Sequence, residues 1–340
     1  MRNCFYPLLL SVFSLFILAG CKKDSKTTTN PTTNTNHKVT SPEYVDSLLF
    51  VNANNYQIQT NDPGATFAST DSHIILTGTK GKIGRLTSAE VVPITITWSD
   101  HTKKIIYALG CTDNNQDMPF VNYQGQLATD CQASYTQGWK TLEKLPISGE
   151  TYAIVLRHAD ASYGTDWPID HTAGQIAPAN WWTSTDSTLV RQLNPQGVDR
   201  ATQLGQIFKD LNYPIKRVVT SEFYRARQTA TLMNMGVTAS IDGRINHPTY
   251  NLYKPGLFMG MTAVLQGQPV DNNMTLVIAH HPINELNAVT GYPSFPSVSP
   301  FNWTGAYLIK IETDGTLTYE GAASWGMFKA WRNLKLHKSS

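Results

Sequence analysis

The chain has 340 residues, of which 41% are hydrophobic and 15% are charged, and its formal net charge is +2. It is longer than one average domain, so we expect two domains, and its composition excludes a disordered protein and a coiled coil. Because the charge is close to balance, it gives no indication of a nucleic-acid partner.

Residues 1–20 have the pattern of a secretory signal peptide. One basic residue precedes an apolar run at positions 8–18, which is too short for a comfortable membrane span. The run ends in Leu-Ala-Gly-Cys at positions 18–21, which resembles the bacterial lipobox. The resemblance implies cleavage after residue 20 and a diacylglycerol anchor on Cys21, and the alternative is an ordinary signal followed by a chance cysteine.

This start of the chain leads us to expect a protein of the cell envelope of a Gram-negative bacterium. It would be attached to a membrane through Cys21 and face the periplasm or the cell surface. Residues 21–40 are expected to form a flexible linker, because Thr, Asn, Ser and Lys dominate them and apolar residues are scarce.

The cysteines agree with export. Once Cys4 is removed with the signal and Cys21 carries lipid, Cys111 and Cys131 remain. In an oxidising compartment we expect these two to form a disulfide that stabilises the fold by about 3 kcal/mol, with two separate thiols as the alternative.

Residues 41–149 show strand-like patterns at 73–77, 91–98 and 104–109, with turn residues between them. We expect a small antiparallel all-β domain here. It resembles the immunoglobulin-like sandwich of exported bacterial proteins. No catalytic group of residues is visible in this part of the sequence.

Residues 150–335 alternate between strand and helix patterns, which predicts an α/β domain with a mainly parallel sheet. Strands are expected at 152–156, 218–219 and 274–279, and two late strands at 306–311 and 316–319. Asn194 followed by Pro195 indicates the start of a helix, because apolar residues then recur at three- and four-residue spacing as far as Leu211. A second helix is expected after Ser221.

Polar side chains follow three of these predicted strands. Arg157 and His158 follow the first, Ser221 and Arg225 the second, and His280 the third. Ligands of open α/β sheets bind beyond the carboxyl ends of the strands, so we expect these side chains to converge. Guanidinium groups match phosphate oxygens, and a neutral imidazole is a nucleophile toward phosphorus. The sequence therefore predicts a phosphoryl-transfer pocket with His158 as the nucleophile.

Three motifs resemble the histidine phosphatase superfamily, which includes the phosphoglycerate mutases. Leu-Arg-His-Ala at 156–159 is similar to the family's Arg-His-Gly or Arg-His-Ala signature. The run at 221–230 is similar to its Ser-x-x-x-Arg-x-x-Gln-Thr-Ala segment, and the run at 193–197 to its Leu-Thr-x-x-Gly segment. The resemblance covers about residues 151–328 and implies a three-layer phosphoglycerate mutase-like domain.

The resemblance also implies roles for individual residues. His158 would be phosphorylated, while Arg157, Arg225 and His280 would bind the phosphoryl group without a metal or another cofactor. Ser221 could bind a phosphate oxygen or cap the following helix, and the sequence leaves both open. His281 is expected to support the substrate site.

The proton donor of the family has no match in this chain. Mutase-like members carry Arg-Leu-Asn-Glu, where this chain has Arg-Ile-Asn-His at 244–247, and another branch places an aspartate where this chain has His281. Alkyl phosphates need an acid to protonate the leaving group. The candidates are His247, Asp160, Glu222 and Asp242. Because the usual glutamate is missing, we hypothesise that activated phosphates react faster than simple sugar phosphates.

We therefore expect an enzyme, a phosphatase that hydrolyses a phosphomonoester or an activated phosphate through a phosphohistidine. Its substrate would be a phosphorylated small molecule or a phosphopeptide. The alternative is a catalytically degenerate family member that binds a phosphorylated or glycan ligand at the cell envelope.

Overall fold

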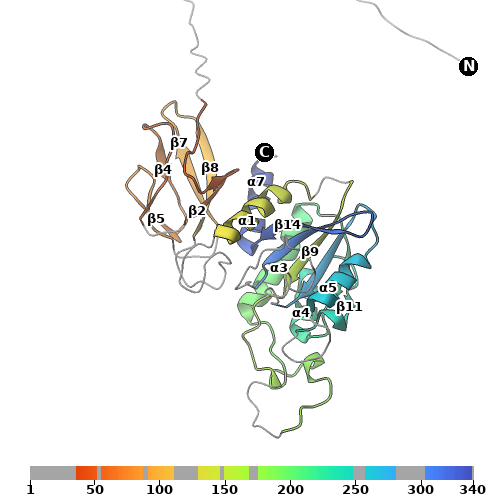
Figure 1. The fold of residues 1–340 in the computed structure, drawn as a ribbon. Coiled ribbons are helices and arrows are strands. Elements are labelled where there is room, and N and C mark those ends of the chain that lie inside the picture. The colour runs from red at the N-terminus through yellow and green to blue at the C-terminus, as the bar shows by residue number, and fades with distance from the viewer. Residues whose placement is uncertain are drawn as a thin grey trace, which may run out of the picture. The chain divides into compact units, whose positions relative to one another are not determined.

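The computed structural model describes residues 36–51, 55–86, 91–110, 129–145, 149–167, 175–247, 257–280 and 303–338. Contacts divide the chain into Met1–Asn36 and His37–Ser340, and every element below lies in the second unit (Figure 1).

The predicted signal peptide, Cys21 and most of the predicted linker lie outside the described residues. So does Cys111, and the disulfide therefore stays a prediction. No helix in the described ranges combines the length and the apolar composition needed to cross a lipid bilayer.

Two β-sheets are formed by the described residues before position 111. Their strands are β1 (Tyr44–Val45), β2 (Leu48–Val51), β3 (Tyr56–Gln57), β4 (Thr66–Ala68), β5 (Ile74–Thr77), β6 (Lys82–Leu86), β7 (Val92–Thr97) and β8 (Lys103–Gly110). One sheet has the order β1-β2-β8-β7-β4 and the other β3-β6-β5. The three strands predicted from the sequence correspond to β5, β7 and β8.

The expectation of an antiparallel domain is wrong at one pair, because β2 and β8 run parallel. A parallel pair needs a long connection, and the five strands between β2 and β8 supply it. All four residues of β2 are buried, so both of its faces are covered. Leu49 and Val51 belong to the core that the two sheets share, whereas Leu48 and Phe50 belong to the core of the α/β elements. The immunoglobulin-like architecture and the boundary at residue 150 stay predictions.

Helix α1 (Thr129–Leu142) lies in the stretch that the sequence analysis grouped with the β domain, and it packs against β14. A Cβ atom on Gly138 would lie 1.8 Å from the carbonyl oxygen of Ala322 in β14, so only glycine allows this approach. Trp139, the next residue of the helix, donates a hydrogen bond of 3.0 Å from Nε1 to the carbonyl oxygen of Asp46. Cys131 lies near the start of this helix.

A six-stranded sheet forms the centre of the α/β part (Figure 1). Its strands are β9 (Thr151–Arg157), β10 (Ile215–Thr220), β11 (Ser240–Ile241), β12 (Met274–Ala279), β13 (Ala306–Ile311) and β14 (Leu317–Ala323). The order is β11-β10-β12-β9-β13-β14, with parallel pairing from β11 to β9 and antiparallel pairing of β13 and β14. The predicted α/β class with a mainly parallel sheet is confirmed.

Helices connect and cover these strands. They are η1 (Trp181–Thr183), α3 (Pro195–Asp210), α4 (Tyr224–Met233), η2 (Gly243–Ile245), α5 (Leu257–Gln266) and α7 (Trp325–Lys338). The predicted start of α3 is confirmed: Pro195 is its first residue, and the Asn194 side chain accepts a hydrogen bond of 2.7 Å from the Gly197 N–H. A Cβ atom on Gly197 would lie 2.2 Å from the carbonyl oxygen of Asp160. The first turn of α3 therefore touches the loop that follows His158.

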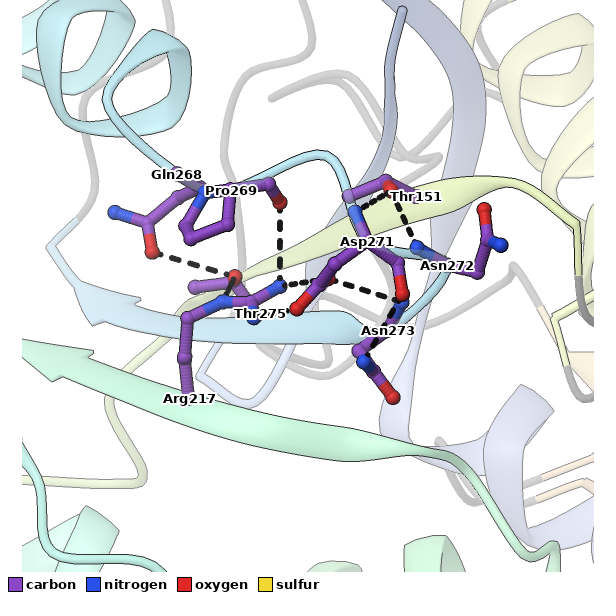
Figure 2. A network of polar contacts seen from close by, with 8 residues as sticks. All are labelled: Thr151, Arg217, Gln268, Pro269, Asp271, Asn272, Asn273 and Thr275. Carbon is purple, nitrogen blue, oxygen red and sulfur yellow. Dashed lines mark hydrogen bonds and ion pairs between the residues drawn. The ribbon is translucent and has the colours of Figure 1, made fainter. Parts of the chain in front are cut away.

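A polar network ties together β9, β10 and β12 near their amino ends (Figure 2). Arg217 donates to both carboxylate oxygens of Asp271, at 2.7 and 2.9 Å, and to Oγ1 of Thr275 at 3.0 Å. Oγ1 of Thr151 accepts the N–H groups of Asp271 and Asn272, both at 3.0 Å. These bonds hold the amino ends of the three strands together, at the opposite edge of the sheet from their carboxyl ends.

Candidate active site

The carboxyl ends of β9, β10 and β12 lie next to one another at one edge of the sheet. Arg157, the last residue of β9, is paired with Ala279, the last residue of β12. The His158 N–H donates to the Ala279 carbonyl oxygen at 2.9 Å, and the imidazole rings of His158 and His280 are 5.2 Å apart between centroids. Ser221 follows β10 and donates its N–H to β12 at 3.2 Å. The structure therefore brings the three predicted strand ends together.

His158 is buried and held in one tautomer. Its Nδ1 atom lies 2.7 Å from the carbonyl oxygen of Ala159, and since a carbonyl can only accept, the ring hydrogen is on Nδ1. Its Nε2 atom accepts a hydrogen bond of 3.2 Å from Nε of Arg225. Burial, followed by the charges of Arg225 and Arg157, holds the pKa of His158 well below its ordinary value. The imidazole is therefore neutral at pH 7, and its lone pair is on Nε2.

Arg225 is fully buried in the first turn of α4, and a buried aspartate holds it. Nη1 of Arg225 donates to Oδ1 of Asp166 at 3.1 Å, and both side chains have no exposed surface. The same carboxylate accepts two hydrogen bonds from Arg191, at 3.0 Å from the backbone N–H and at 2.9 Å from Nε. One carboxylate thus binds two guanidinium groups, and that of Arg225 lies beside the His158 imidazole.

Arg157 lies against the indole ring of Trp303, with its guanidinium carbon 5.1 Å from the ring centroid. Burial lowers the pKa of Arg157 to about 9, and the charges of Arg225 and Arg191 act in the same direction. The side chain therefore still carries its charge at neutral pH. Its charge and that of Arg225 both lower the pKa of His158, so the two predicted phosphate-binding arginines act on the same imidazole.

His280 is buried against Ser221. Its Nε2 atom lies 2.7 Å from Oγ of Ser221, and its Nδ1 atom makes no hydrogen bond with any residue that the structure describes. The pKa of His280 is far below its ordinary value, chiefly because of burial and then because of Arg225. Ser221 does not cap the next helix, since the N-cap position of α4 is Phe223 and no side chain caps it.

The four candidate proton donors have different surroundings. The His247 ring lies 5.6 Å from the His280 ring, and one oxygen of Glu222 accepts hydrogen bonds from Trp182 and Asn246. Asp160 is buried and accepts the N–H of Ser162, and its charge acts on Arg157. The carboxylate of Asp242 is bonded to Arg244, both its backbone and its guanidinium, at the start of η2. His281 lies outside the described residues.

Two residues of the site, Asp166 and Thr229, were assigned no role from the sequence, although Thr229 is part of the segment at 221–230. Asp166 lies in an irregular segment, where no periodicity or motif marks a single aspartate. Thr229 accepts the N–H of Ala159 at 3.1 Å and donates to the Arg225 carbonyl oxygen at 2.8 Å, so it joins the loop after His158 to α4. The only sequence signal for Asp166 is indirect: a buried arginine requires an acidic partner.

The pocket has the composition of an anion site. Among the described residues, no group of three or more His, Cys, Asp or Glu side chains is arranged to hold a metal ion. The charged donors around His158 are guanidinium groups, which match the oxygens of a phosphoryl group in shape and charge. An imidazole lone pair beside guanidinium donors is an arrangement that can bind a phosphoryl dianion and attack its phosphorus atom.

Comparisons with known proteins give no family match and no curated relative. Solved structures similar to the chain include the protein histidine phosphatase SixA complexed with tungstate, with a TM-score of 0.36 and 21% identity, covering 51% of this chain and 97% of that one. A phosphoserine phosphatase from Entamoeba histolytica has a TM-score of 0.32 and 14% identity, covering 52% and 98%. A phosphoglycerate mutase from Plasmodium falciparum has a TM-score of 0.29 and 14% identity, covering 50% and 87%. At these values the likeness assigns no activity to this chain.

Proposed function

We propose that this protein is a histidine phosphatase with a three-layer phosphoglycerate mutase-like domain, and that it hydrolyses a phosphomonoester or an activated phosphate through a phosphohistidine at His158. The observation that carries the proposal is the state of this one side chain. It is buried and neutral, its Nδ1 hydrogen is bonded to a backbone carbonyl, and its Nε2 lone pair faces the guanidinium group of Arg225. A neutral imidazole whose lone pair is directed at a bound phosphoryl group can act as a nucleophile toward phosphorus.

In the first step the substrate phosphoryl group replaces the hydrogen bond between Arg225 and His158. Arg225 and Arg157 then donate to the phosphoryl oxygens and stabilise the charge that develops on them. The bond between Nε2 and phosphorus forms while the bond between phosphorus and the leaving-group oxygen breaks. The Ala159 carbonyl oxygen retains the Nδ1 hydrogen and stabilises the positive charge of the phosphorylated ring.

In the second step a water molecule attacks the phosphorus atom of phosphohistidine and gives a proton to His247, which replaces the proton that His247 donated to the leaving group in the first step. The bond between Nε2 and phosphorus breaks, inorganic phosphate leaves, and the electron pair returns to Nε2. In the proposed mechanism the Ser221 hydroxyl donates to Nε2 of His280, so the ring hydrogen of His280 is on Nδ1. His280 then donates this hydrogen to a phosphoryl oxygen. A neutral His280 can in this way bind a phosphoryl oxygen without adding charge.

We assign protonation of the leaving group to His247, because its ring lies against the ring of His280. Glu222 is a weaker candidate, since one of its oxygens already accepts two hydrogen bonds. Asp242 is bonded to Arg244. Activated phosphates need less protonation, so the proposal retains the expectation that they react faster than sugar phosphates.

The cellular setting of the proposal comes from the sequence alone. The protein would be anchored by lipid on Cys21 in the envelope of a Gram-negative bacterium, where it would act on a phosphorylated small molecule or a phosphopeptide.

The proposal is tested by trapping the intermediate. Full-length protein is mixed with radiolabelled acetyl phosphate, quenched in alkali within milliseconds to seconds, and the bound label is then treated with acid. We expect acid-labile label approaching one phosphate per protein on the wild type and none on His158→Asn.

Arg227→Gln is the matched control, because Arg227 is two residues from Arg225 on α4 but donates to the Thr183 carbonyl oxygen at 2.6 Å. This variant should be labelled like the wild type. Release of phosphate by the wild type without any label, or equal label on His158→Asn, would contradict the covalent mechanism. Ligand binding without release from any phosphate would favour the degenerate binding protein instead.

A further inference from the structure

The amide side chain of Asn246 joins the end of η2 to the carboxyl end of β10. Asn246 is only 1% exposed, and both polar atoms of its amide are bonded to Glu222. Oδ1 accepts the backbone N–H of Glu222 at 2.9 Å, and Nδ2 donates to Oε2 of the Glu222 carboxylate at 2.6 Å. Because a buried amide without partners costs free energy, the folded state favours this pair of bonds.

The Asn246–Glu222 pair is also held from other sides. The backbone N–H of Asn246 donates to the Gly243 carbonyl oxygen at 3.0 Å, and the preceding residue, Ile245, has no exposed surface. Oε2 of Glu222 accepts a second hydrogen bond, of 3.1 Å, from Nε1 of Trp182. The backbone at position 246 is therefore fixed, and so is the direction in which the chain enters residue 247.

The two residues that flank the pair in the sequence both contact His280. Ser221 precedes Glu222, and its hydroxyl oxygen lies 2.7 Å from Nε2 of His280. His247 follows Asn246, and its ring lies 5.6 Å from the His280 ring between centroids. The charge of His247 also contributes to the lowered pKa of His280. The pair thus connects two segments that meet on one imidazole of the phosphoryl pocket.

We propose that Asn246 and Glu222 are positioning residues, which hold His247 where it protonates the leaving group during phosphoryl transfer to His158. The inference rests on the proposed function, which assigns this proton to His247. As the bond between phosphorus and the leaving-group oxygen breaks, the proton moves from the His247 ring to that oxygen. A general acid has to lie within hydrogen-bond reach of the atom that it protonates, and a displacement of about 1 Å can cost about a hundredfold in rate.

The test compares leaving groups that need protonation to different degrees. We measure kcat/KM, which covers the reaction as far as phosphohistidine, on the full-length protein with acetyl phosphate, para-nitrophenyl phosphate, phenyl phosphate and a primary alkyl phosphate. Acetate leaves readily without an acid, whereas an alkoxide does not. The ratio of kcat/KM for the alkyl phosphate to that for acetyl phosphate does not depend on the folded fraction, because unfolded protein lowers both values equally.

Removing the pair should resemble removing the acid. Asn246→Ala should reduce the ratio by about a hundredfold, as should His247→Gln. Glu222→Ala leaves the backbone N–H of residue 222 bonded to Asn246, so it should reduce the ratio less, by about tenfold. Glu222→Gln retains an oxygen that can accept from Asn246 and Trp182, and its ratio should stay within about threefold of the wild type.

Arg244→Gln is the matched control. Arg244 is two residues from Asn246, but its guanidinium group is half-exposed and is bonded to Asp242 on the surface. This variant should keep the wild-type ratio. The thermal midpoint of each variant is measured to confirm that it folds.

The inference is overturned if Asn246→Ala and Glu222→Ala change kcat/KM for all four phosphates by the same factor or not at all, since the pair would then be merely structural. It is also overturned if Glu222→Gln loses as much as His247→Gln, because Glu222 would then be the acid. An unchanged ratio in His247→Gln would place the donor elsewhere and overturn it too. Failure of the proposed function is recognised separately, because the wild type would then form no phosphohistidine from radiolabelled acetyl phosphate.

Discussion

Asp166→Asn removes one negative charge from the pocket and keeps the shape of the side chain. Asp166 is fully buried and accepts three hydrogen bonds, of 3.1 Å from Arg225 and of 3.0 and 2.9 Å from Arg191. Breaking a buried ion pair by removing one partner costs roughly 3–5 kcal/mol, because the other charge stays buried. The share of this cost that comes from Arg191 is smaller, because its side chain is one-third exposed and water can solvate its charge. We therefore expect the free energy of unfolding to fall by about 3 kcal/mol.

A phosphate ion should restore much of this loss. In Asp166→Asn the buried Arg225 guanidinium has lost its carboxylate, so an anion in the pocket takes over part of the compensation. A ligand that binds only the folded state stabilises it by about 2.7 kcal/mol at one hundred times its dissociation constant. Inorganic phosphate should accordingly stabilise Asp166→Asn more than it stabilises the wild type at the same concentration.

The measurement is urea unfolding of the full-length protein followed by tryptophan fluorescence, with and without phosphate. Asp186→Asn is the control, because its neighbour Ser187 accepts the N–H of Thr165, next to Asp166. Asp186 itself lies on the surface, where it accepts the backbone N–H and the hydroxyl of Thr188. It should change stability by less than about 1 kcal/mol. A loss below about 1 kcal/mol for Asp166→Asn, or equal stabilisation of variant and wild type by phosphate, would refute the assigned role of Asp166.

Three further predictions concern pH and hydrogen bonding. The unfolded chain protonates its histidines below about pH 6.5, whereas His158 and His280 stay neutral in the folded state. The free energy of unfolding should therefore fall by about 2.7 kcal/mol per pH unit below that point for the two histidines together. His158→Gln should remove half of this slope in urea titrations, and an unchanged slope would contradict the buried neutral state. For the same reason the acid limb of kcat/KM for acetyl phosphate should lie well below pH 6.5, and a midpoint at 6.5 would show that the nucleophile is not perturbed. Thr151→Val leaves two backbone N–H groups without their acceptor, so the free energy of unfolding in urea should fall by about 2–3 kcal/mol. Thr151→Ser keeps the oxygen and should lower it by less than about 1 kcal/mol. Equal losses would show that the hydroxyl is not the stabilising group.

Those parts of the fold that depend on local signals could be predicted from the sequence. The start of α3 follows from Asn194 and Pro195, whose capping chemistry acts within a few residues. Strand β13 has the predicted bounds of 306–311, because an apolar run and an Asp-Gly turn mark it. The convergence of Arg157, His158 and His280 follows from one topological rule, since parallel strands end at a common edge.

The rest depends on contacts between distant segments, which one sequence does not show. Strand β14 extends to Ala323, beyond the predicted end at residue 319, because it is paired with β13 and covered by α1. Asp166 and Thr229 act through partners far from them in the sequence. The sequence leaves Ser221 open between binding a phosphate and capping a helix; the structure excludes the cap and places the hydroxyl against His280, while phosphate binding stays a prediction.

The close approach of Gly197 to the Asp160 backbone leaves the nucleophile loop no freedom to shift on its own. The first turn of α3 fixes this loop, and α3 in turn buries Ala201, Leu204 and Phe208 in the core. One wall of the pocket is therefore as immobile as the protein interior. Adaptation to substrates of different length has to come from side chains that reach solvent, such as the guanidinium group of Arg191.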